Sequence, residues 1–393
     1  MTHQQLKREL GMGGAVVTGL GSIVGTGAFV AIGLASSRWG DVVIWAIPLA
    51  AFVATFNGLS SAYLAGCFPV AGGTYEYGYR ALNQWFGFGA GWLFLMAKTA
   101  SAATAALGIA LYMGIDNALV PIGAVAVIMG LVLAGIRRTA VVNAALVGIT
   151  VAAIAWFAWS GLRGTGGAST LNFGREPTNE VLAATAFIFV AFTGYGRIAT
   201  LGEEVRDPAR VIPRAVVVTL VIATLLYMAI EIGGRAMAGE SWGAILELGF
   251  LDMPFVTFGA ITAMLGVLLN LILGLSRVWL AMGRRGDMPS ALARLDPRSE
   301  PTAAVVLSAV LVAALTLLDD IGLAWSFSAM TVLLYYGITN LAALAVDRRR
   351  TTAWLGLGSC LFLSVFVPAA VWLAGVGLMV AGVVWKIVYS RLT

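Results

Sequence analysis

Two glycine-interrupted apolar segments contain the residues of this chain that are best suited to bind a small charged molecule. The first reads Gly19-Leu-Gly-Ser-Ile-Val-Gly-Thr-Gly27, with four glycines in nine residues. A glycine inside a helix costs about 1 kcal/mol relative to alanine, so this segment is a weak helix. It indicates either close helix packing through Gly21 and Gly25 or a broken helix whose second half directs free amides at an anion. It is not a dinucleotide-binding loop, because the spacing differs from Gly-x-Gly-x-x-Gly and no strand precedes it.

A second interruption, Phe192-Thr-Gly-Tyr-Gly196, lies in the sixth apolar segment. If spans one to five and six to ten form two inverted repeats, the first and sixth spans occupy corresponding positions. Paired interruptions at corresponding positions in two halves are the best sequence indication of a transporter binding site. The two segments together therefore favour the broken-helix interpretation.

Two ionisable residues inside predicted membrane spans are candidates for a coupling role. Lys98 is roughly 12–14 residues, or about 20 Å, from either end of its span, and an ionisable group at that depth costs about 2.5–3.5 kcal/mol on insertion scales. We hypothesise that it lines a central cavity as a proton-coupling group or substrate contact. The alternative is a structural lysine bonded to helix carbonyls or to a buried acid. Glu231, the only carboxylate inside a predicted span, has either a functional role or a pairing role in an outer vestibule.

The residue content argues against enzyme chemistry. The single histidine, His3, lies in the amino-terminal tail, so a histidine metal cluster or histidine base is excluded in practice. Cys67 and Cys360 are too far apart in sequence for a CxxC site. The sequence has no GxxxxGK[ST] nucleotide-binding segment, which argues against ATP-driven transport by this chain alone. It also has no repeated pore motif, which argues against a channel. We expect no catalytic residues, no metal and no cofactor.

The chain that carries these residues is too apolar for a soluble domain. Of its 393 residues, 60% are hydrophobic and 11% are charged, with a mean hydropathy of +0.92, whereas soluble domains carry roughly 25% charged residues. The outer surface must therefore face lipid, and we predict an all-α polytopic membrane protein. Since a spanning helix needs about 20 residues, the apolar runs predict about twelve spans, at 12–35, 42–66, 86–112, 118–136, 139–161, 181–201, 214–236, 254–281, 302–318, 321–346, 353–370 and 372–389.

The distribution of Lys and Arg predicts the orientation in the membrane. Of these 24 residues, 17 fall in segments on the side of the amino terminus, four fall on the opposite side and three fall within or at the ends of spans. Because cytoplasmic loops carry the excess of Lys and Arg, both termini are predicted to be cytoplasmic. The amino-terminal segment has no Ala-x-Ala cleavage site and is interpreted as a retained first helix.

Four sets of motifs resemble those of the amino acid–polyamine–organocation (APC) superfamily, in order along spans one to ten. They are Gly21-Ser-Ile-Val-Gly-Thr-Gly-Ala-Phe29; Phe68-Pro-Val-Ala-Gly-Gly-Thr-Tyr-Glu-Tyr77 with Gly87-Phe-Gly-Ala-Gly-Trp92; Phe192-Thr-Gly-Tyr195 with Glu203-Glu-Val-Arg-Asp-Pro-Ala-Arg-Val-Ile-Pro-Arg214; and Ser276-Arg277 with Gly286-Asp-Met-Pro289. The resemblance implies an amino acid permease with a LeuT-like fold of five-plus-five inverted repeats, in which helices 1 and 6 are broken. It divides the single transporter domain, 1–393, into a first repeat at 12–161, a second repeat at 181–347 and a carboxyl-terminal helix pair at 353–389.

The resemblance also places an amino acid between the two broken helices. The implied substrate contacts are Ile23, Gly25, Thr26, Gly27, Val190, Phe192, Thr193, Gly194 and Tyr195. The amides of residues 25–27 would bind the carboxylate, since a half-helix amino terminus supplies unpaired donors and positive potential. Carbonyls near Ile23, Val190 and Thr193 would bind the ammonium group. Phe192 and Tyr195 are either gate or side-chain-pocket residues, or packing aromatics.

The positions associated with ion coupling depart from the family pattern. Many members carry a lysine in helix five, seven residues after an Asn like Asn143, where this chain has Thr150. Many also carry a glutamate in helix six where this chain has Gly196. The usual proton-coupling groups are therefore missing from both positions. Ser276 and Asn270 can contribute oxygens to a sodium site, although hydroxyls in membrane helices more often bond their own backbone.

We predict a secondary active transporter of neutral L-amino acids in the cell (inner) membrane, working by alternating access with proton coupling or exchange. A cavity that contains Lys98 and no clear midplane carboxylate would repel cationic side chains. The alternatives are an exporter or exchanger of anionic or cationic amino acids or polyamines, and a sodium-coupled symporter. The expected partners are the amino acid, a proton or sodium ion, and the lipid bilayer. Nucleic acid is not among them, because no basic stripe with interleaved aromatics is present.

Overall fold

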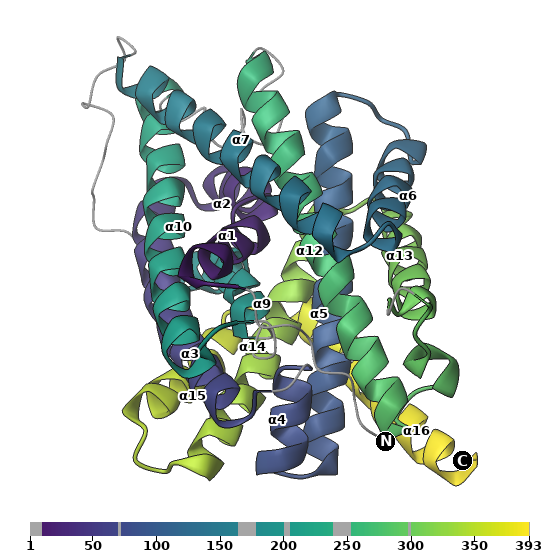
Figure 1. Cartoon of the computed structure of the whole chain (residues 1–393). Helices are drawn as coiled ribbons and strands as arrows, with labels where there is room; N and C mark the ends of the chain where they lie inside the picture. The colour runs from purple at the N-terminus through teal and green to yellow at the C-terminus, as the bar shows by residue number, and fades with distance from the viewer. Residues whose placement is uncertain are drawn as a thin grey trace.

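The computed structural model describes residues 10–69, 72–163, 178–199, 205–238, 253–297 and 300–392. Within these ranges the regular structure is helical (Figure 1), apart from one isolated bridge between Leu10 and Val205. The all-α prediction is confirmed for this part of the chain. Glu203 and Glu204, which begin the motif that follows the sixth span, lie outside the described residues.

Each predicted apolar span contains a helix. The first five correspond to α1 (Met12–Ile23), η1 (Gly27–Ala31) and α2 (Ile32–Trp39); α3 (Val43–Cys67); α5 (Gln84–Met113); α6 (Leu119–Leu133); and α7 (Ile136–Arg163). The next five correspond to α8 (Thr178–Phe192), η4 (Thr193–Tyr195) and α9 (Gly196–Ala199); α10 (Pro208–Ala238); α12 (Pro254–Arg285); α13 (Thr302–Thr316); and α14 (Ile321–Val346). The last two are α15 (Thr351–Ser364) and α16 (Ala369–Leu392). In the described part, eight helical stretches are long and apolar enough to cross a membrane, and four shorter apolar helices accompany them.

Two connections show details that the apolar pattern did not resolve. The segment after α3 turns sharply at Gly72 and Gly73, whose φ angles are +113° and +56°, a conformation that glycine adopts without a steric cost. It then forms a short helix, α4 (Thr74–Ala81). The final apolar run divides before Pro368 into α15 and α16, because proline lacks the amide that would continue a helix through it.

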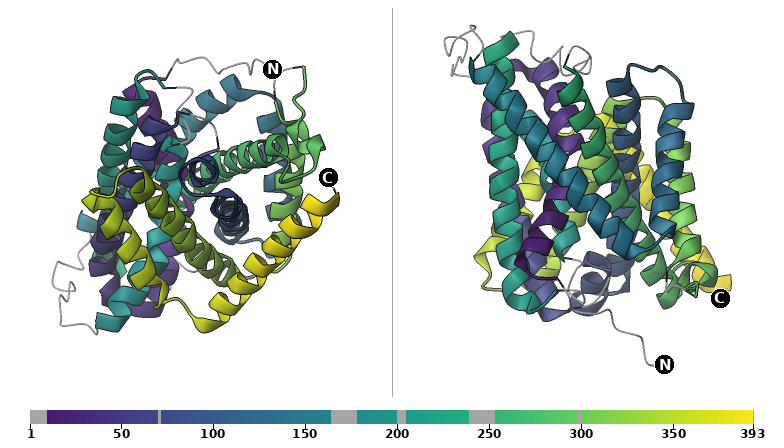
Figure 2. Two further views of the ribbon diagram at one scale, coloured as in Figure 1. Left: turned by 90° about the horizontal axis from the view of Figure 1, so that it is seen from below. Right: turned by 45° about the horizontal axis from the view of Figure 1, so that its top comes forward.

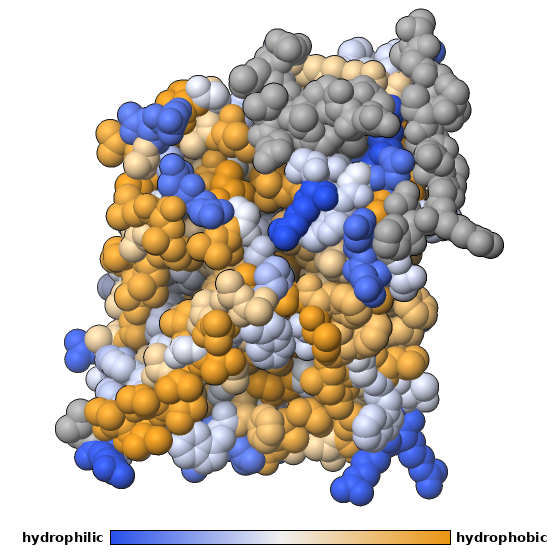
Figure 3. All heavy atoms as spheres, turned by 180° about the vertical axis from the view of Figure 1, so that it is seen from behind, coloured by the Kyte–Doolittle hydropathy of each residue, from blue (hydrophilic) through white to orange (hydrophobic). Residues whose placement is uncertain are grey.

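The helices form one bundle with α5 in its interior. α5 packs against α12 and α14, and α10 packs against α3 and α7. α16 has most of its residues exposed and runs along the periphery in the left view of Figure 2. Large apolar side chains such as Leu225, Val365 and Leu373 are more than 60% exposed. Figure 3 shows hydrophobic residues over most of one side of the molecule, the surface expected of a protein in lipid.

The bundle has two polar ends. We call the end with α4 and the carboxyl ends of α12 and α16 the inner face, and the end with the α2–α3 turn and the carboxyl end of α10 the outer face (Figure 1). At the inner face, Lys386 of α16 donates to the carbonyl of Gln84 at the start of α5. At the outer face, Arg235 of α10 forms an ion pair with Asp41 in the turn between α2 and α3.

Candidate binding site at the two helix breaks

The first predicted break lies in the middle of the first membrane span. α1 ends at Ile23, Val24 adopts an extended conformation with φ −85° and ψ 96°, and helical structure resumes at Gly27. A helix end leaves carbonyls or amides without intrahelical partners. At the end of α1 the carbonyl of Ile23 accepts a hydrogen bond from the Tyr227 hydroxyl at 2.8 Å. A side chain from α10 therefore supplies a hydrogen-bond donor to one of the carbonyls that the end of α1 leaves without an intrahelical partner.

The second break is a turn of 3₁₀-helix at Thr193–Tyr195, between α8 and α9. It approaches the first break so closely that a Cβ atom added to Gly194 would collide with the backbone carbonyl of Ser22. A Cβ atom on Gly25 would lie 2.7 Å from the carbonyl oxygen of Ala263 in α12. Helix breaking and close helix packing, posed as alternatives by the sequence, thus occur together.

A narrow central pocket of about 20 Å³ lies where the two breaks meet. Its lining consists of Ser22, Ile23, Thr26, Gly27, Lys98, Ser101, Val190, Ala191, Thr193, Gly194, Val267, Leu271 and Trp325. Six of the nine implied substrate contacts are in this set. In this conformation the pocket has room for about one water molecule.

Thr26 supplies the most direct indication of a ligand in the central pocket. Its side chain is only 2% exposed, and its hydroxyl has no hydrogen-bond partner among the described residues. A buried hydroxyl without a partner costs free energy. Thr26 and Gly27, where helical structure resumes, both line the pocket, and a helix amino terminus offers unpaired amide donors that suit a carboxylate.

Lys98 reaches the central pocket from α5. Its Nζ atom lies 3.0 Å from the hydroxyl oxygen of Thr193, and that hydroxyl donates to the carbonyl of Val190 at 2.8 Å. The side chain is 6% exposed. The ammonium group therefore contacts the second break through a hydroxyl, and the predicted position of Lys98 at a central cavity agrees with the lining of the pocket.

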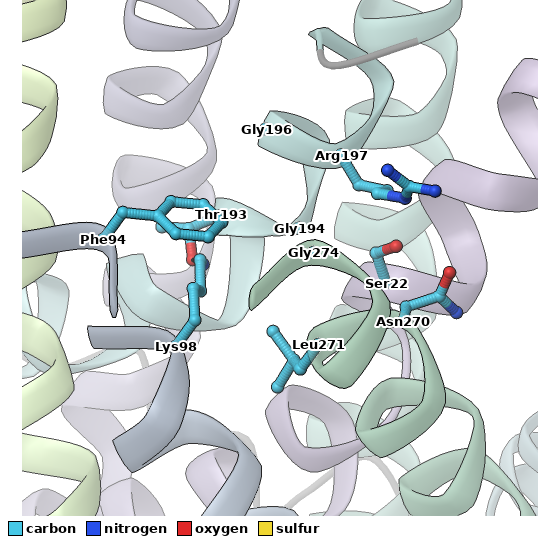
Figure 4. A pocket seen from close by; sticks show the side chains of 10 residues that line it. All are labelled: Ser22, Phe94, Lys98, Thr193, Gly194, Gly196, Arg197, Asn270, Leu271 and Gly274. Atoms are coloured by element: carbon cyan, nitrogen blue, oxygen red, sulfur yellow. The ribbon is translucent and has the colours of Figure 1, made fainter. Parts of the chain in front are cut away.

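A second, inner pocket adjoins the central one toward α9 (Figure 4). The two pockets share Ser22, Lys98, Thr193, Gly194 and Leu271, and the inner pocket adds Phe94, Gly196, Arg197, Asn270 and Gly274. Sequence reasoning did not single out Arg197, Ser101 or Trp325 as site residues. The available signal for Arg197 was its place one residue after the second glycine interruption.

Two implied contacts, Phe192 and Tyr195, lie outside both pocket linings. The ring of Phe192 packs 5.0 Å from that of Tyr227, and the ring of Tyr195 packs 5.1 Å from that of Tyr336, measured between centroids. Both side chains are fully buried. In this conformation they make the packing contacts that the sequence left as their alternative role. Gly25, the third implied contact outside the linings, packs against α12.

The hydroxyls at the two candidate coupling positions in α7 and α12, Thr150 and Ser276, form hydrogen bonds with carbonyls of their own helices. The Thr150 hydroxyl donates to the carbonyl of Leu146, and the Ser276 hydroxyl donates to the carbonyl of Leu273, each at 2.8 Å. Gly196 instead lines the inner pocket. Thr150 and Ser276 thus show the own-backbone bonding that is common for hydroxyls in membrane helices.

Asn270 joins α12 to the end of α1 through its amide nitrogen. The Nδ2 atom lies 3.2 Å from the carbonyl oxygen of Gly21, 2.9 Å from that of Gly266 and 2.6 Å from the Oδ1 atom of Asn143. Because two of these partners are backbone carbonyls, the nitrogen and not the oxygen must face them. The side-chain oxygen of Asn270, proposed as a sodium ligand, therefore points away from the carbonyl of Gly21.

Glu231 belongs to a buried ion network at the outer face. It is fully buried, accepts a hydrogen bond from the Ser36 hydroxyl at 2.8 Å and pairs with Arg235 at 2.6 Å. Arg235 also pairs with Asp41 and donates to the carbonyl of Gly40. The structure thus gives Glu231 the pairing role, linking α10 to the second half of the broken first helix.

A separate polar cluster closes the inner face. Glu76 pairs with Arg80 at 3.5 Å, and Arg285 approaches Glu76 to 2.6 Å. The hydroxyls of Tyr75 and Tyr79 donate to one Asp287 oxygen at 2.7 and 2.6 Å. Burial, with the adjacent Asp287 carboxylate, raises the pKa of both tyrosines above the usual range. Both hydroxyls therefore remain protonated donors at physiological pH.

The fold and the site together define a polytopic α-helical membrane protein with a buried pocket between two interrupted helices, the arrangement in which membrane transporters bind their substrates. Comparison with known proteins identifies the family of this chain. The chain matches the family Amino acid permease over residues 14–239 and 252–390 and belongs to that family.

Among its relatives, an uncharacterized transporter of Mycobacterium tuberculosis is 37% identical over 96% of this chain and 90% of that protein. A branched-chain amino acid permease of Bacillus subtilis is 26% identical over 75% of this chain and 71% of that protein. A vacuolar cationic amino acid transporter of Arabidopsis thaliana is 24% identical over 81% of this chain and 59% of that protein. The family and these relatives agree with the APC resemblance of the sequence.

Proposed function

We propose that this protein is a secondary transporter of neutral L-amino acids that works by alternating access at the central pocket. The observation that carries the proposal is the buried, unpartnered hydroxyl of Thr26 in the same pocket as the resumed helix at Gly27 and the ammonium group of Lys98. These groups suit the carboxylate of an amino acid, because each is a donor or carries positive charge.

The ammonium group of the substrate binds the carbonyls of Ile23, Val190 and Thr193. Each of these carbonyls already accepts one protein hydroxyl, from Tyr227, Thr193 and Tyr336 respectively. A carbonyl oxygen has two lone pairs and can accept a second hydrogen bond. Amide donors at the first break, together with carbonyl acceptors at both breaks, therefore suit a zwitterion.

The charge of the pocket favours neutral side chains. The ionisable side chains that line the central and inner pockets are Lys98 and Arg197, and no described acidic residue is among the lining. A cationic substrate side chain would meet positive charge in a low-dielectric environment. The cationic selectivity in the name of the Arabidopsis thaliana relative therefore does not carry over to this chain, whereas anionic amino acids remain the runner-up substrates.

Transport is coupled to protons or proceeds by exchange, and Lys98 is the coupling group. The ammonium of Lys98 contacts the second helix break directly, so a change in its charge would alter the contact between α5 and that break. Sodium coupling is less well supported, because the Ser276 hydroxyl and the Asn270 amide already bond helix carbonyls. We place the protein in the cell membrane with both termini cytoplasmic, as the distribution of Lys and Arg predicts.

Counterflow in proteoliposomes tests this function. Vesicles are loaded with one unlabelled amino acid at a time, and entry of the labelled form is followed. Uptake with a subset of neutral amino acids and none with arginine, lysine or polyamines is the expected result. Counterflow only with acidic or only with basic amino acids would overturn the substrate class, and counterflow with none would overturn the assignment as an amino acid transporter.

A further inference from the structure

A separate pocket of about 130 Å³, which we call the outer pocket, lies at the outer face of the bundle. The end of α2, the first half of α8, the start of α14 and the connection between α15 and α16 form its walls. Its lining is apolar apart from the side chains of Arg38 and Ser326 and the indole of Trp39. It shares no lining residue with the central or the inner pocket.

Arg38 gives the outer pocket a positive charge that no described acidic residue pairs with. Its side chain is exposed, and its guanidinium carbon lies 4.9 Å from the centroid of the Trp39 ring. Asp41, three positions along the chain, pairs with Arg235 instead. No described acidic residue lines the outer pocket. Because a guanidinium group binds a carboxylate through two parallel hydrogen bonds, the mouth of the pocket suits a carboxylate.

Ser326 is a second, independent indication of a ligand. Its side chain lines the outer pocket and is only 9% exposed, yet its hydroxyl forms no hydrogen bond with a described residue. Ser328, two positions further along α14, donates to the carbonyl of Ala97 at 3.0 Å. A buried hydroxyl without a partner costs free energy. A ligand with a polar group in the outer pocket would supply that partner.

The size and the walls of the outer pocket select a compact apolar group. Trp39, Phe187 and Phe366 contribute aromatic rings to the lining. An apolar cavity of about 150 Å³ is sufficient for benzene, so this pocket suits a ring or a branched alkyl group and is too small for a long acyl chain. An ammonium group would meet no negative charge there. The chemistry therefore favours an apolar monocarboxylate over a free amino acid.

An aromatic wall connects the outer pocket to the central pocket. Phe187 lines the outer pocket, whereas Trp325 lines the central one. Their ring centroids are 6.1 Å apart, and the indole nitrogen of Trp325 donates to the carbonyl of Phe187 at 2.9 Å. Trp39 packs against Phe187 with ring centroids 5.4 Å apart. A ligand in the outer pocket therefore contacts the residue that supports one wall of the central pocket.

We propose that the outer pocket is a regulatory site for compact apolar monocarboxylates. Arg38 binds the carboxylate, and the aromatic walls hold the apolar group. The bound ligand fixes Phe187 against Trp325 and slows transport without occupying the central pocket. The binding site stands independently of the proposed function, whereas its effect on transport rests on that function.

Binding of phenylacetate to the purified protein, titrated by saturation-transfer NMR, tests the site. For Arg38→Gln we expect the Kd to rise about tenfold or more, as for the loss of a hydrogen bond to a charged group. Arg38→Lys keeps the charge without the two-pronged geometry and should show a smaller rise. The matched control is Arg163→Gln, because Arg163 is exposed and lies over the ring of Trp159 at 4.0 Å but does not line the pocket. This control should keep the wild-type Kd.

A second variant and a neutral ligand protect the test against a misfolded protein. Ala183→Leu fills the outer pocket from a partly exposed position, so it should raise the Kd for phenylacetate while the apparent Tm stays at the wild-type value. Phenylacetamide, which lacks the charge, should bind the wild type far less well. No binding of phenylacetate, equal binding of the two compounds, or a wild-type Kd in both Arg38→Gln and Ala183→Leu would overturn the site.

Counterflow of a neutral amino acid tests the effect on transport. Phenylacetate should lower the maximal rate of the wild type with little change in KM, and this inhibition should be lost in Arg38→Gln. Competitive inhibition that persists in Arg38→Gln would place the carboxylate in the central pocket and overturn the regulatory role. Absence of counterflow in the wild type would overturn the proposed function and the regulatory role, whereas the NMR titration would still decide the site.

Discussion

At the scale of single residues, Lys98 is the side chain whose charge is expected to matter most for transport. Its Nζ atom lies 3.0 Å from the hydroxyl of Thr193 at the second helix break, and an ionisable group inside a membrane span is a functional candidate by default. Lys98→Met keeps the length of the side chain and removes its charge. We expect at least a tenfold fall in counterflow rate and a flatter dependence of the remaining rate on external pH.

The matched control for Lys98→Met is Thr104→Ala, because Thr104 is buried on the same helix and bonds its own backbone at Ala100. Initial rates between about pH 5 and 8, where proton-coupled transport would change, provide the comparison. The control should keep the wild-type pH profile. If Lys98→Met keeps both the rate and the pH profile, Lys98 is a structural residue.

At the scale of helices, the network of Glu231, Arg235 and Asp41 holds the second half of the broken first helix against α10. Glu231 is fully buried, whereas the Asp41 side chain is 30% exposed. Removing one partner of a buried ion pair costs about 3–5 kcal/mol, because the other charge is left uncompensated. Glu231→Ala should therefore lower the apparent Tm of the purified protein, and Asp41→Ala should lower it by less.

A double variant separates the loss of the ion pair from the loss of packing. Glu231→Met with Arg235→Met replaces both buried charges with apolar groups, a change that is often neutral or stabilising in a buried site, and leaves the Asp41 carboxylate, whose side chain is 30% exposed, in contact with solvent. Its apparent Tm should exceed that of Glu231→Ala in the same detergent. A double variant less stable than Glu231→Ala, or an Asp41→Ala variant less stable than Glu231→Ala, would contradict this role for Glu231.

At the scale of the whole molecule, the two polar ends of the bundle should face different compartments, with the inner face in the cytoplasm. Cys67 is exposed and Cys360 is buried, so both are first replaced by alanine. In that background, Asn117→Cys near the start of α6 and Arg349→Cys beside α15 introduce exposed thiols at opposite ends of the bundle. A membrane-impermeant maleimide should label residue 117 in intact cells and residue 349 only after permeabilisation. The reverse pattern would refute the orientation predicted from Lys and Arg.

Local chemistry in the sequence was sufficient to locate the membrane-spanning helices and the two interruptions, but not the short helix α4. Spans are long apolar runs because the bilayer excludes unsatisfied backbone groups, so composition alone locates them. The breaks at residues 24–26 and 193–195 follow from glycine-rich stretches that weaken a helix. The division into two inverted repeats remains a prediction, since it rests on the family resemblance.

Only the tertiary structure decided which side chains meet at the site. Lys98 and Thr193 are 95 positions apart, and Ser36 and Glu231 are 195 apart, so no local pattern connects either pair. The packing of the helices determines which side chains face a pocket. Arg197 therefore lines the inner pocket, whereas Phe192 and Tyr195 pack against other aromatic rings. Hydrophobicity and helix propensity act along the chain and are readable from it, whereas the contacts of a polar side chain depend on how distant helices pack.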